Sequence, residues 1–253
     1  MKVILLCAGY ATRLYPLTLD KPKPLLSVAG KPIIEYLLEN IIQIKKIDAV
    51  YIVTNNKFAD IFKDWENEFQ FPLPIIIIND KTMSNDDRLG AIGDLYYTIQ
   101  QSHIDDDVLV IAGDNLFDLN MIDFCNFAEK NKPYASIAVF DVKHKDLARK
   151  YGLVELNNEG QVIDFKEKPE KPRTTLASLA LYFYPQETIK FIEKYIHEGN
   201  NPDQPGHYAA WLSRCYKVYA YPFDGHWFDV GDFDSLEKAN LFFKNKKVKQ
   251  KES

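Results

Sequence analysis

Two apolar patterns alternate along the first half of the chain. Short runs that are apolar throughout and rich in β-branched residues are typical of strands covered on both faces; they occupy residues 2–6, 49–54, 74–79 and 107–112. The stretches between them have helical spacing or length and few breakers; they are residues 32–44, 58–68 and 90–101. This β-α-β-α-β order predicts an α/β fold with a Rossmann-like, mainly parallel sheet that carries helices on both faces.

After Asp114 the regular alternation of strands and helices ends. We expect strands at 134–142, 152–157, 161–166, 176–184 and 217–223, with the second and third forming a hairpin, and helices at 120–131, 186–197, 207–214 and 234–246. This order predicts a smaller mixed α+β lobe packed on the first unit. The chain is therefore expected to form one domain, residues 1–253, with halves 1–118 and 119–246 and a flexible tail at 247–253.

The bulk composition is that of a soluble globular protein. Of 253 residues, 46% are hydrophobic and 26% are charged, and the formal net charge is −5. No long basic block interleaves with aromatic residues, so nucleic acid is not an expected partner. The basic stretch from Lys244 to Lys251 is typical of a solvated end. No segment reaches the roughly 18 apolar residues of a membrane span, so no membrane association is expected.

The three cysteines, Cys7, Cys125 and Cys215, are far apart in the sequence. They form neither a disulfide framework nor a metal-ligand spacing. This usage fits a reducing compartment and predicts a cytoplasmic protein. The oligomeric state is not readable from the sequence, and a homo-oligomer stays open.

The loop after the first predicted strand carries the first candidate chemistry. In an open parallel sheet, ligands bind beyond the carboxyl ends of the strands, where small residues let backbone N–H groups approach phosphate oxygens. The small residues here are Ala8, Gly9, Ala11 and Thr12. Arg13 then offers a bidentate cation, and Lys23, between two prolines, adds a compact charge. From these residues alone, a phosphate site and a tight turn with two surface cations fit equally well.

Two aspartates, Asp114 and Asp229, carry the second candidate chemistry. Asp114 comes after the strand 107–112, and Asp229 lies within Trp-Phe-Asp-Val-Gly at 227–231. Acidic residues at strand ends near a phosphate loop are candidate Mg²⁺ ligands, because Mg²⁺ takes few carboxylates and completes its shell with water and substrate phosphates. Each aspartate alone fits a turn or helix-approach residue equally well.

Residues 6–18 read Leu-Cys-Ala-Gly-Tyr-Ala-Thr-Arg-Leu-Tyr-Pro-Leu-Thr, with Lys23 ten residues after Arg13. The stretch resembles the signature of the sugar-nucleotide pyrophosphorylases, the nucleotidyltransferases that join a sugar 1-phosphate to a nucleoside triphosphate. It departs from that signature at Cys7, where the family usually has Ala, and at Ala11, where it usually has Gly. An alanine at position 11 is tolerable if its φ is negative and awkward if it is not.

Further motifs extend the resemblance over roughly residues 1–240. The Gly-Asp-Asn at 113–115 and the Trp-x-Asp-x-Gly at 227–231 stand where the family supplies its metal ligands. The resemblance therefore implies that Asp114 and Asp229 bind Mg²⁺.

The second half resembles the sugar side of the family. Residues 151–155 (Tyr-Gly-Leu-Val-Glu) and 165–169 (Phe-Lys-Glu-Lys-Pro) match its Y-G-x-V and E-K-P motifs, and a strand ends in Tyr-Phe-Tyr at 182–184. The implied sugar-phosphate residues are Tyr151, Gly152, Glu167 and Lys168. Residues 119–246 would then bind the sugar and complete the metal site. In isolation, a hairpin with a charged surface is the better interpretation of these residues.

The resemblance is weakest at residues 80–95, where many family members carry a loop that reads the base. Arg88 stands at the position of the family's Gly, and Arg88 and Gly90 are the expected nucleotide contacts here. Residues 200–215 have no clear counterpart, which leaves the rim of the sugar pocket open.

The resemblance implies a nucleotidyl transfer from an NTP to a sugar 1-phosphate, with dTTP and glucose 1-phosphate as the best guess from the thymidylyltransferase branch. In it, Arg13 would hold the β,γ-phosphates, Lys23 the α-phosphate and Lys168 the attacking phosphate. Two alternatives stay open. One is cytidylyl or other nucleotidyl transfer to a different sugar phosphate or to phosphocholine. The other is a non-catalytic sugar-nucleotide-binding regulatory protein, which could have lost the cations and aspartates that this chain retains.

Overall fold

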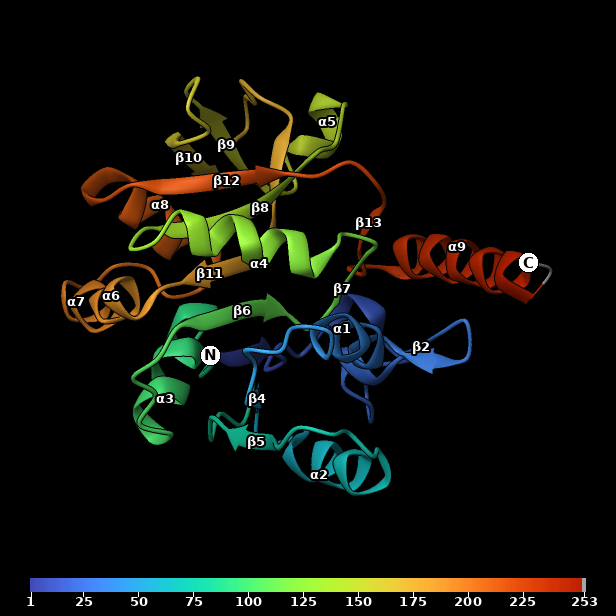
Figure 1. Cartoon of the computed structure of the whole chain (residues 1–253). Coiled ribbons are helices and arrows are strands. Elements are labelled where there is room, and N and C mark those ends of the chain that lie inside the picture. The colour runs from blue at the N-terminus through green and yellow to red at the C-terminus, as the bar shows by residue number, and fades with distance from the viewer. Residues whose placement is uncertain (252–253) are drawn as a thin grey trace.

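The computed structural model describes residues 1–251, which fold around a nine-stranded sheet (Figure 1). Along its main path the strand order is β10-β9-β11-β6-β1-β4-β5, and β8 joins β11 to β12. The strands are β1 (Lys2–Leu6), β4 (Ala49–Thr54), β5 (Ile75–Asn79), β6 (Val108–Ala112), β8 (Ala135–Asp141), β9 (Gly152–Leu156), β10 (Val162–Glu167), β11 (Leu176–Tyr184) and β12 (Val218–Pro222).

The first half of the chain forms the parallel part of this sheet, as its apolar runs predicted. β1 pairs in parallel with β4 and β6, and β4 pairs in parallel with β5. β11 then joins β6 in the antiparallel sense, and the remaining strands of the second half attach to β11 or β8. The mixed second half therefore continues the same sheet, and β9, β10 and α5 (Lys145–Ala148) project from its end (Figure 1).

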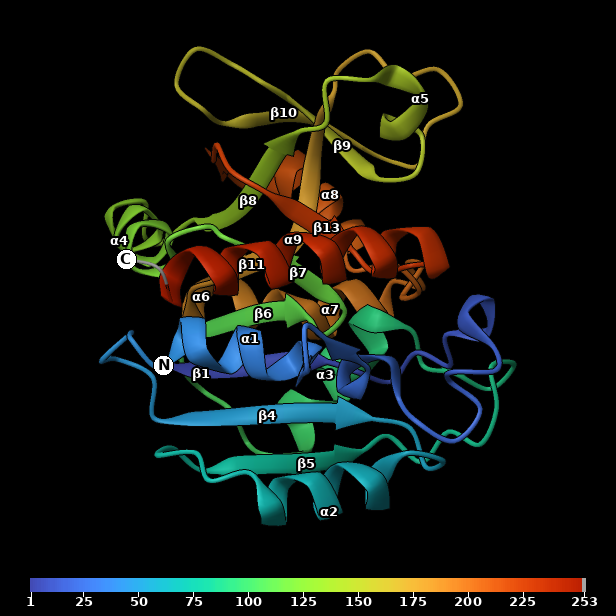
Figure 2. The ribbon, with the colours of Figure 1, turned by 90° about the vertical axis from the view of Figure 1, so that its right-hand side faces the viewer.

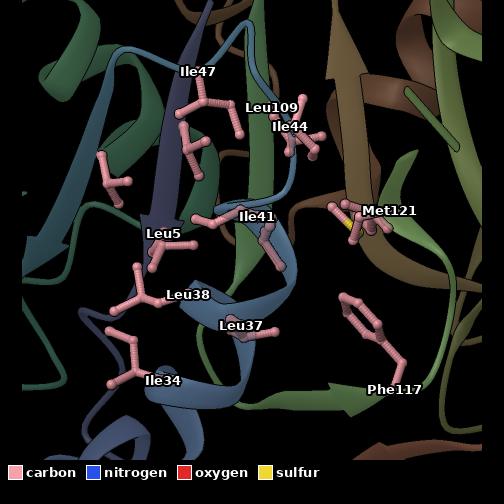
Figure 3. Close-up of a cluster of buried hydrophobic side chains, with 14 of the residues drawn as sticks. Leu5, Ile34, Leu37, Leu38, Ile41, Ile44, Ile47, Leu109, Phe117 and Met121 are labelled. Carbon is pink, nitrogen blue, oxygen red and sulfur yellow. The ribbon is translucent and has the colours of Figure 1, made fainter. Parts of the chain in front are cut away.

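Helices cover both faces of the sheet. Since successive strand residues point to opposite faces, neighbouring residues of one strand pack against different helices. Val3 and Leu5 of β1 belong to a core with helices α1, α2 and α4, whereas Ile4 belongs to a core with α3, α7 and α8. Figure 3 shows α1 against Leu5 and Leu109 in the first of these cores. The helices are α1 (Ile33–Ile41), α2 (Ala59–Glu68), α3 (Ala91–Gln101), α4 (Met121–Lys130), α6 (Gln186–Ile189), α7 (Phe191–His197) and α8 (Gly206–Cys215).

Two small ribbons lie outside the main sheet. β2 (Ser27–Val28) pairs with β3 (Lys31–Pro32), and β7 (Asn115–Phe117) pairs with β13 (Trp227–Asp229), each in the antiparallel sense. Strands of two or three residues are too short to produce a period in the sequence, which is why the pattern did not predict them. The β7–β13 ribbon joins segments that are far apart in the chain.

Helix α9 (Phe233–Lys251) closes the fold by packing on the N-terminal half, across the front of the sheet in Figure 2. The Tyr36 and Phe243 rings lie 4.7 Å apart, and the Asn240 side chain accepts a hydrogen bond from the backbone N–H of Ala29 at 2.7 Å. The predicted tail at 247–253 is helical as far as Lys251, since its Lys and Gln residues favour helix; residues 252–253 lie outside the described chain. Among the described residues, no helix is both long and apolar enough to cross a membrane.

Candidate active site

The carboxyl ends of β1 and β6 open into a cleft of about 1000 Å³. This is the edge at which parallel α/β sheets bind their ligands. All the side chains and backbone positions that the sequence singled out line this cleft: Ala8, Gly9, Ala11, Thr12, Arg13, Lys23, Arg88, Gly90, Asp114, Tyr151, Gly152, Glu167, Lys168 and Asp229. The fold brings these stretches, which are far apart in the sequence, into one hollow.

The loop after β1 contains a backbone conformation that an alanine rarely adopts. Ala11 has φ 49° and ψ 41°, in the left-handed region, so the favourable case of a negative φ is not met. The buried Thr18 hydroxyl donates to the Ala11 carbonyl oxygen at 2.8 Å and holds the turn. A non-glycine residue in this region costs about 1–2 kcal/mol. Such strain persists where the surrounding structure enforces it, and here it lies in the wall of the cleft.

Arg13 is held at the cleft by its neighbour in sequence. It lies in a short 3₁₀ helix, Thr12–Leu14, in which Leu14 is fully buried beside residues of α1 and α9. A Cβ atom on Gly231 would lie 3.6 Å from Arg13 Nη2 and 4.0 Å from Asp229 Oδ2. The guanidinium and the carboxylate therefore flank the same glycine.

Lys23 is anchored in the same way and already has an anionic partner. It begins a second 3₁₀ helix, Lys23–Leu25, in which Pro24 and Leu25 are buried. Its ammonium forms an ion pair with the Asp114 carboxylate, and only 14% of the lysine side chain is exposed. The stiff Pro-Lys-Pro segment therefore fixes a cation next to a predicted metal ligand.

The β7–β13 ribbon brings the two aspartates together. Asp229 is opposite Asn115, and the N–H of Val230 donates to the Asp114 carbonyl oxygen at 3.2 Å. The Trp227 indole N–H donates to Asn115 Oδ1 at 2.7 Å and ties the ribbon across its side chains.

The environment of Asp229 suits a bound cation. Burial and the charge of Asp114 raise the pKa of Asp229, while Lys23 and Arg13 oppose that rise. Two carboxylates at one place repel each other until a cation neutralises them, so this donor set fits Mg²⁺. The described residues contain no group of three or more His, Cys, Asp or Glu side chains arranged for a metal ion. Water and phosphate oxygens would have to supply the other ligands.

The residues predicted for the sugar side line another part of the cleft. Glu167 Oε2 lies between two glycines, since a Cβ on Gly152 or on Gly206 would approach it to 2.7 or 2.6 Å. Burial raises the pKa of Glu167. Lys168 has φ 45°, and its ammonium donates to Gln204 Oε1 at 2.8 Å. The hydrogen bond to Gln204 holds this half-exposed lysine at the wall of the cleft.

The predicted base loop is braced by a segment that sequence reasoning left unassigned. Arg88 Nε donates to Asp203 Oδ1 at 2.9 Å, and Nη1 donates to the Asn85 carbonyl oxygen at 2.6 Å. In this loop the backbone requires a glycine at position 90. Gly90 has φ 79°, and a Cβ atom there would lie 2.6 Å from the Pro202 carbonyl oxygen.

Sequence reasoning missed several residues of the cleft, among them Asp94, Asp203, Gln204 and Trp227. Asp94 is 6% exposed in the first turns of α3, and burial together with Asp80 raises its pKa to about 8. An aspartate between the apolar residues Ile92 and Leu95 is a signal that could have been used. Nothing in the local pattern around Asp203 and Gln204 marks them, since they lie in a polar loop.

Comparison with known proteins gives relatives over almost the full chain. The chain is 28% identical over 246 residues to the bifunctional protein GlmU of Methanocaldococcus jannaschii, and the match covers 97% of this chain and 55% of that protein. It is 26% identical over 257 residues to a glucose-1-phosphate adenylyltransferase of Clostridium novyi, covering 95% of this chain and 66% of that protein. The chain thus spans between about half and two thirds of the length of these relatives.

Two solved structures share the fold. One is a Bacillus anthracis protein assigned as a glucose-1-phosphate thymidylyltransferase, in complex with a sucrose (TM-score 0.82, 22% identity, 96% of this chain and 95% of that one). The other is a UDP-glucose pyrophosphorylase complexed with UDP-glucose (TM-score 0.80, 20% identity, 97% and 98%). The model of the nucleotidyl transferase family matches residues 2–246 of this chain. Because that match covers nearly the whole sequence, the chain belongs to the nucleotidyl transferase family, as residues 6–18 indicated.

Proposed function

We propose that this protein transfers a nucleotidyl group from an NTP to a sugar 1-phosphate and releases pyrophosphate. The observation that carries the proposal is the single cleft lined by Arg13, Lys23, Asp114, Lys168 and Asp229. Such a reaction brings two anionic substrates together, and this cleft offers cations at both ends with a carboxylate pair between substrate-facing loops.

The chemistry asks the protein mainly for positioning and charge neutralisation. A phosphate monoester is largely dianionic at neutral pH, so the attacking oxygen needs no general base. Arg13 would hold the β,γ-phosphates and the charge that develops on the leaving pyrophosphate, and Lys23 would stabilise the α-phosphate. Lys168 would hold the phosphate of the sugar.

Asp114 and Asp229 are the residues that would hold Mg²⁺, which when bound supplies Lewis-acid stabilisation of phosphate oxygens. Lys23 already pairs with Asp114. In this proposal, its ammonium would exchange the carboxylate for oxygens of the α-phosphate as that ligand binds.

We propose dTTP and glucose 1-phosphate as the substrates. This choice comes from the sequence resemblance to the thymidylyltransferase branch. The names of several relatives, which mention glucose 1-phosphate or UDP-glucose, support the sugar more than the base. A cytoplasmic setting belongs to the same proposal and rests on the cysteine usage.

The test is a survey of pyrophosphate release with each of four NTPs against a panel of sugar 1-phosphates, in the presence of Mg²⁺. We expect turnover with at least one pair, and highest with dTTP and glucose 1-phosphate. Higher turnover with CTP would favour the cytidylyl alternative. Absence of turnover with every pair would contradict the proposed reaction.

A further inference from the structure

The loop of residues 201–206 spans the cleft between the predicted base loop and the sugar end. On one side, the carbonyl oxygens of Pro202 and Asp203 accept the N–H groups of Ile92 and Ala91, at 2.8 and 3.0 Å, and so cap the start of α3. On the other side, Gly206 packs directly on the Glu167 carboxylate. The backbone of this loop is therefore fixed at both ends of the cleft.

A continuous chain of side-chain hydrogen bonds runs along this loop. Arg88 Nε donates to Asp203 Oδ1 at 2.9 Å, and Gln204 Nε2 donates to Asp203 Oδ2 at 2.9 Å. Gln204 Oε1 then accepts the Lys168 ammonium at 2.8 Å. All four residues line the cleft, so the chain connects its nucleotide side to its sugar side.

The partner of Lys168 is chemically distinctive. Lys23 is paired with a carboxylate, which neutralises it, whereas the amide of Gln204 orients Lys168 and leaves its charge intact. The Glu167 carboxylate is 3.9 Å from the Lys168 ammonium, and burial raises the pKa of that carboxyl. Lys168 is therefore positioned by an amide and is less compensated than Lys23, and such an ammonium would bind a phosphate dianion more strongly.

We propose that Asp203 and Gln204 are positioning residues, which orient Lys168 toward the sugar phosphate and link it through Arg88 to the base-side loop. This inference rests on the proposed function. Because the four side chains form one chain of hydrogen bonds, a change at Arg88 alters the position of Lys168 and so its binding of the phosphate.

Steady-state kinetics of two Gln204 variants test the positioning. With dTTP and glucose 1-phosphate, or the pair that the survey selects, Gln204→Ala raises KM for the sugar phosphate about tenfold, the scale of one lost hydrogen bond to a charged group. The value of kcat changes less. Gln204→Glu keeps the shape but places a carboxylate on Lys168, and it raises the same KM at least as much. A wild-type KM in the Glu variant would overturn the proposal.

The matched control is Gln186→Ala. Gln186 also uses its side-chain amide, donating to the Asp105 carbonyl oxygen at 3.2 Å, but it does not line the cleft. Its KM values stay at the wild-type level. A thermal melt of each variant shows whether it is folded.

A double-mutant cycle tests the link. Arg88→Ala raises KM for the sugar phosphate, and adding Gln204→Ala to it raises KM little further, because both changes break one chain. If the two effects multiply instead, the residues act independently and the link is overturned.

Acetylation of Lys168 in the substrate-free protein, followed by mass spectrometry, separates this inference from the proposed function. Gln204→Glu slows acetylation because its carboxylate holds the Lys168 ammonium in an ion pair, whereas Gln204→Ala accelerates it because the lysine loses its hydrogen-bond partner. Lys63, an exposed lysine outside the cleft, serves as the internal reference. If these changes in acetylation rate occur in a protein that shows no turnover, the proposed reaction is overturned and the positioning of Lys168 by Gln204 is retained. Unchanged acetylation in an active enzyme would overturn the positioning.

Discussion

The two ends of the cleft are built in different ways. At the proposed nucleotide end, residues 8–23 form one continuous stretch, in which buried Leu14 and Pro24 anchor the cations beside them. At the sugar end, Glu167 and Lys168 depend on a loop near Gln204 that follows much later in the chain. The first end is a local motif, and the second exists only through the tertiary fold.

The charges of the two ends differ as well. Lys23 is held in an ion pair with Asp114, so a phosphate must replace a carboxylate to reach it. Lys168 is held by a neutral amide, and the nearby Glu167 carboxylate is 3.9 Å away, so its charge is less compensated than that of Lys23. If the proposed function holds, we expect the nucleotide end to exchange an ion pair when its ligands bind, and the sugar end to change less.

The largest effect is expected where the two ends meet, at the carboxylate pair. Asp229→Asn removes one ligand charge, and loss of several kcal/mol of charge stabilisation corresponds to about 10³-fold or more in kcat. Excess chelator should have the same effect on the wild type. Asp60→Asn, at an exposed aspartate of α2, is the control and stays active. Full turnover of Asp229→Asn would contradict the proposal that Asp229 binds a metal ion.

Next in size are the two cations of the nucleotide end. Lys23→Ala should lower kcat by about 10²-fold with a smaller change in KM, because charge builds on the α-phosphate in the transition state. Arg13→Ala should raise KM for the NTP as well as lower kcat, since its contacts exist in both states. Arg149→Ala, at an exposed arginine, is the control. Two stable variants with wild-type rates would reduce residues 13–23 to a turn with two surface cations.

A pH dependence should distinguish the buried acid of the nucleotide end. The pKa of Asp94 rises from 3.8 to about 8, so between these values the folded state holds a proton that the unfolded state has released. Stability then falls as pH rises, by at most about 1.4 kcal/mol per unit, and the fall stops above the folded pKa. Asp94→Asn should lack this loss. Thermal melts from pH 5 to 9 measure the difference in Tm between the wild type and Asp94→Asn. A difference that stays constant over this range would contradict the raised pKa of Asp94.

The smallest effect concerns the strained alanine. Ala11→Gly relieves a left-handed conformation but adds freedom to the unfolded chain, so the net gain is at most about 1 kcal/mol, or roughly 2–4 °C in Tm. Ala8→Gly in the same loop is the control and should lower Tm, because Ala8 is not among the residues with positive φ. A lower Tm for Ala11→Gly would mean that packing, not φ, governs this position.

Local patterns predicted most of the main elements within one or two residues, including the hairpin of β9 and β10 and the long strand β11. Hydrophobic periodicity is a property of a contiguous segment, so elements of five or more residues leave a readable trace. The ribbon of β7 and β13 left none, because its strands are short and their pairing is non-local. The end of α9 was also missed, since a contact such as that of the Lys247 ammonium with the Ala29 carbonyl oxygen is tertiary.

The same division applies to the candidate site. The sequence by itself predicted the candidate phosphate loop, placed Lys23 between two prolines, and singled out Asp114 and Asp229, because each of these features lies in a short run of residue types. Only the tertiary structure decided that Lys23 pairs with Asp114, that Ala11 is left-handed, and that residues 201–206 connect Arg88 to Lys168. Hydrogen bonds and ion pairs act over about 3–4 Å in space, whatever the separation in sequence, so their partners are set by the folded chain alone.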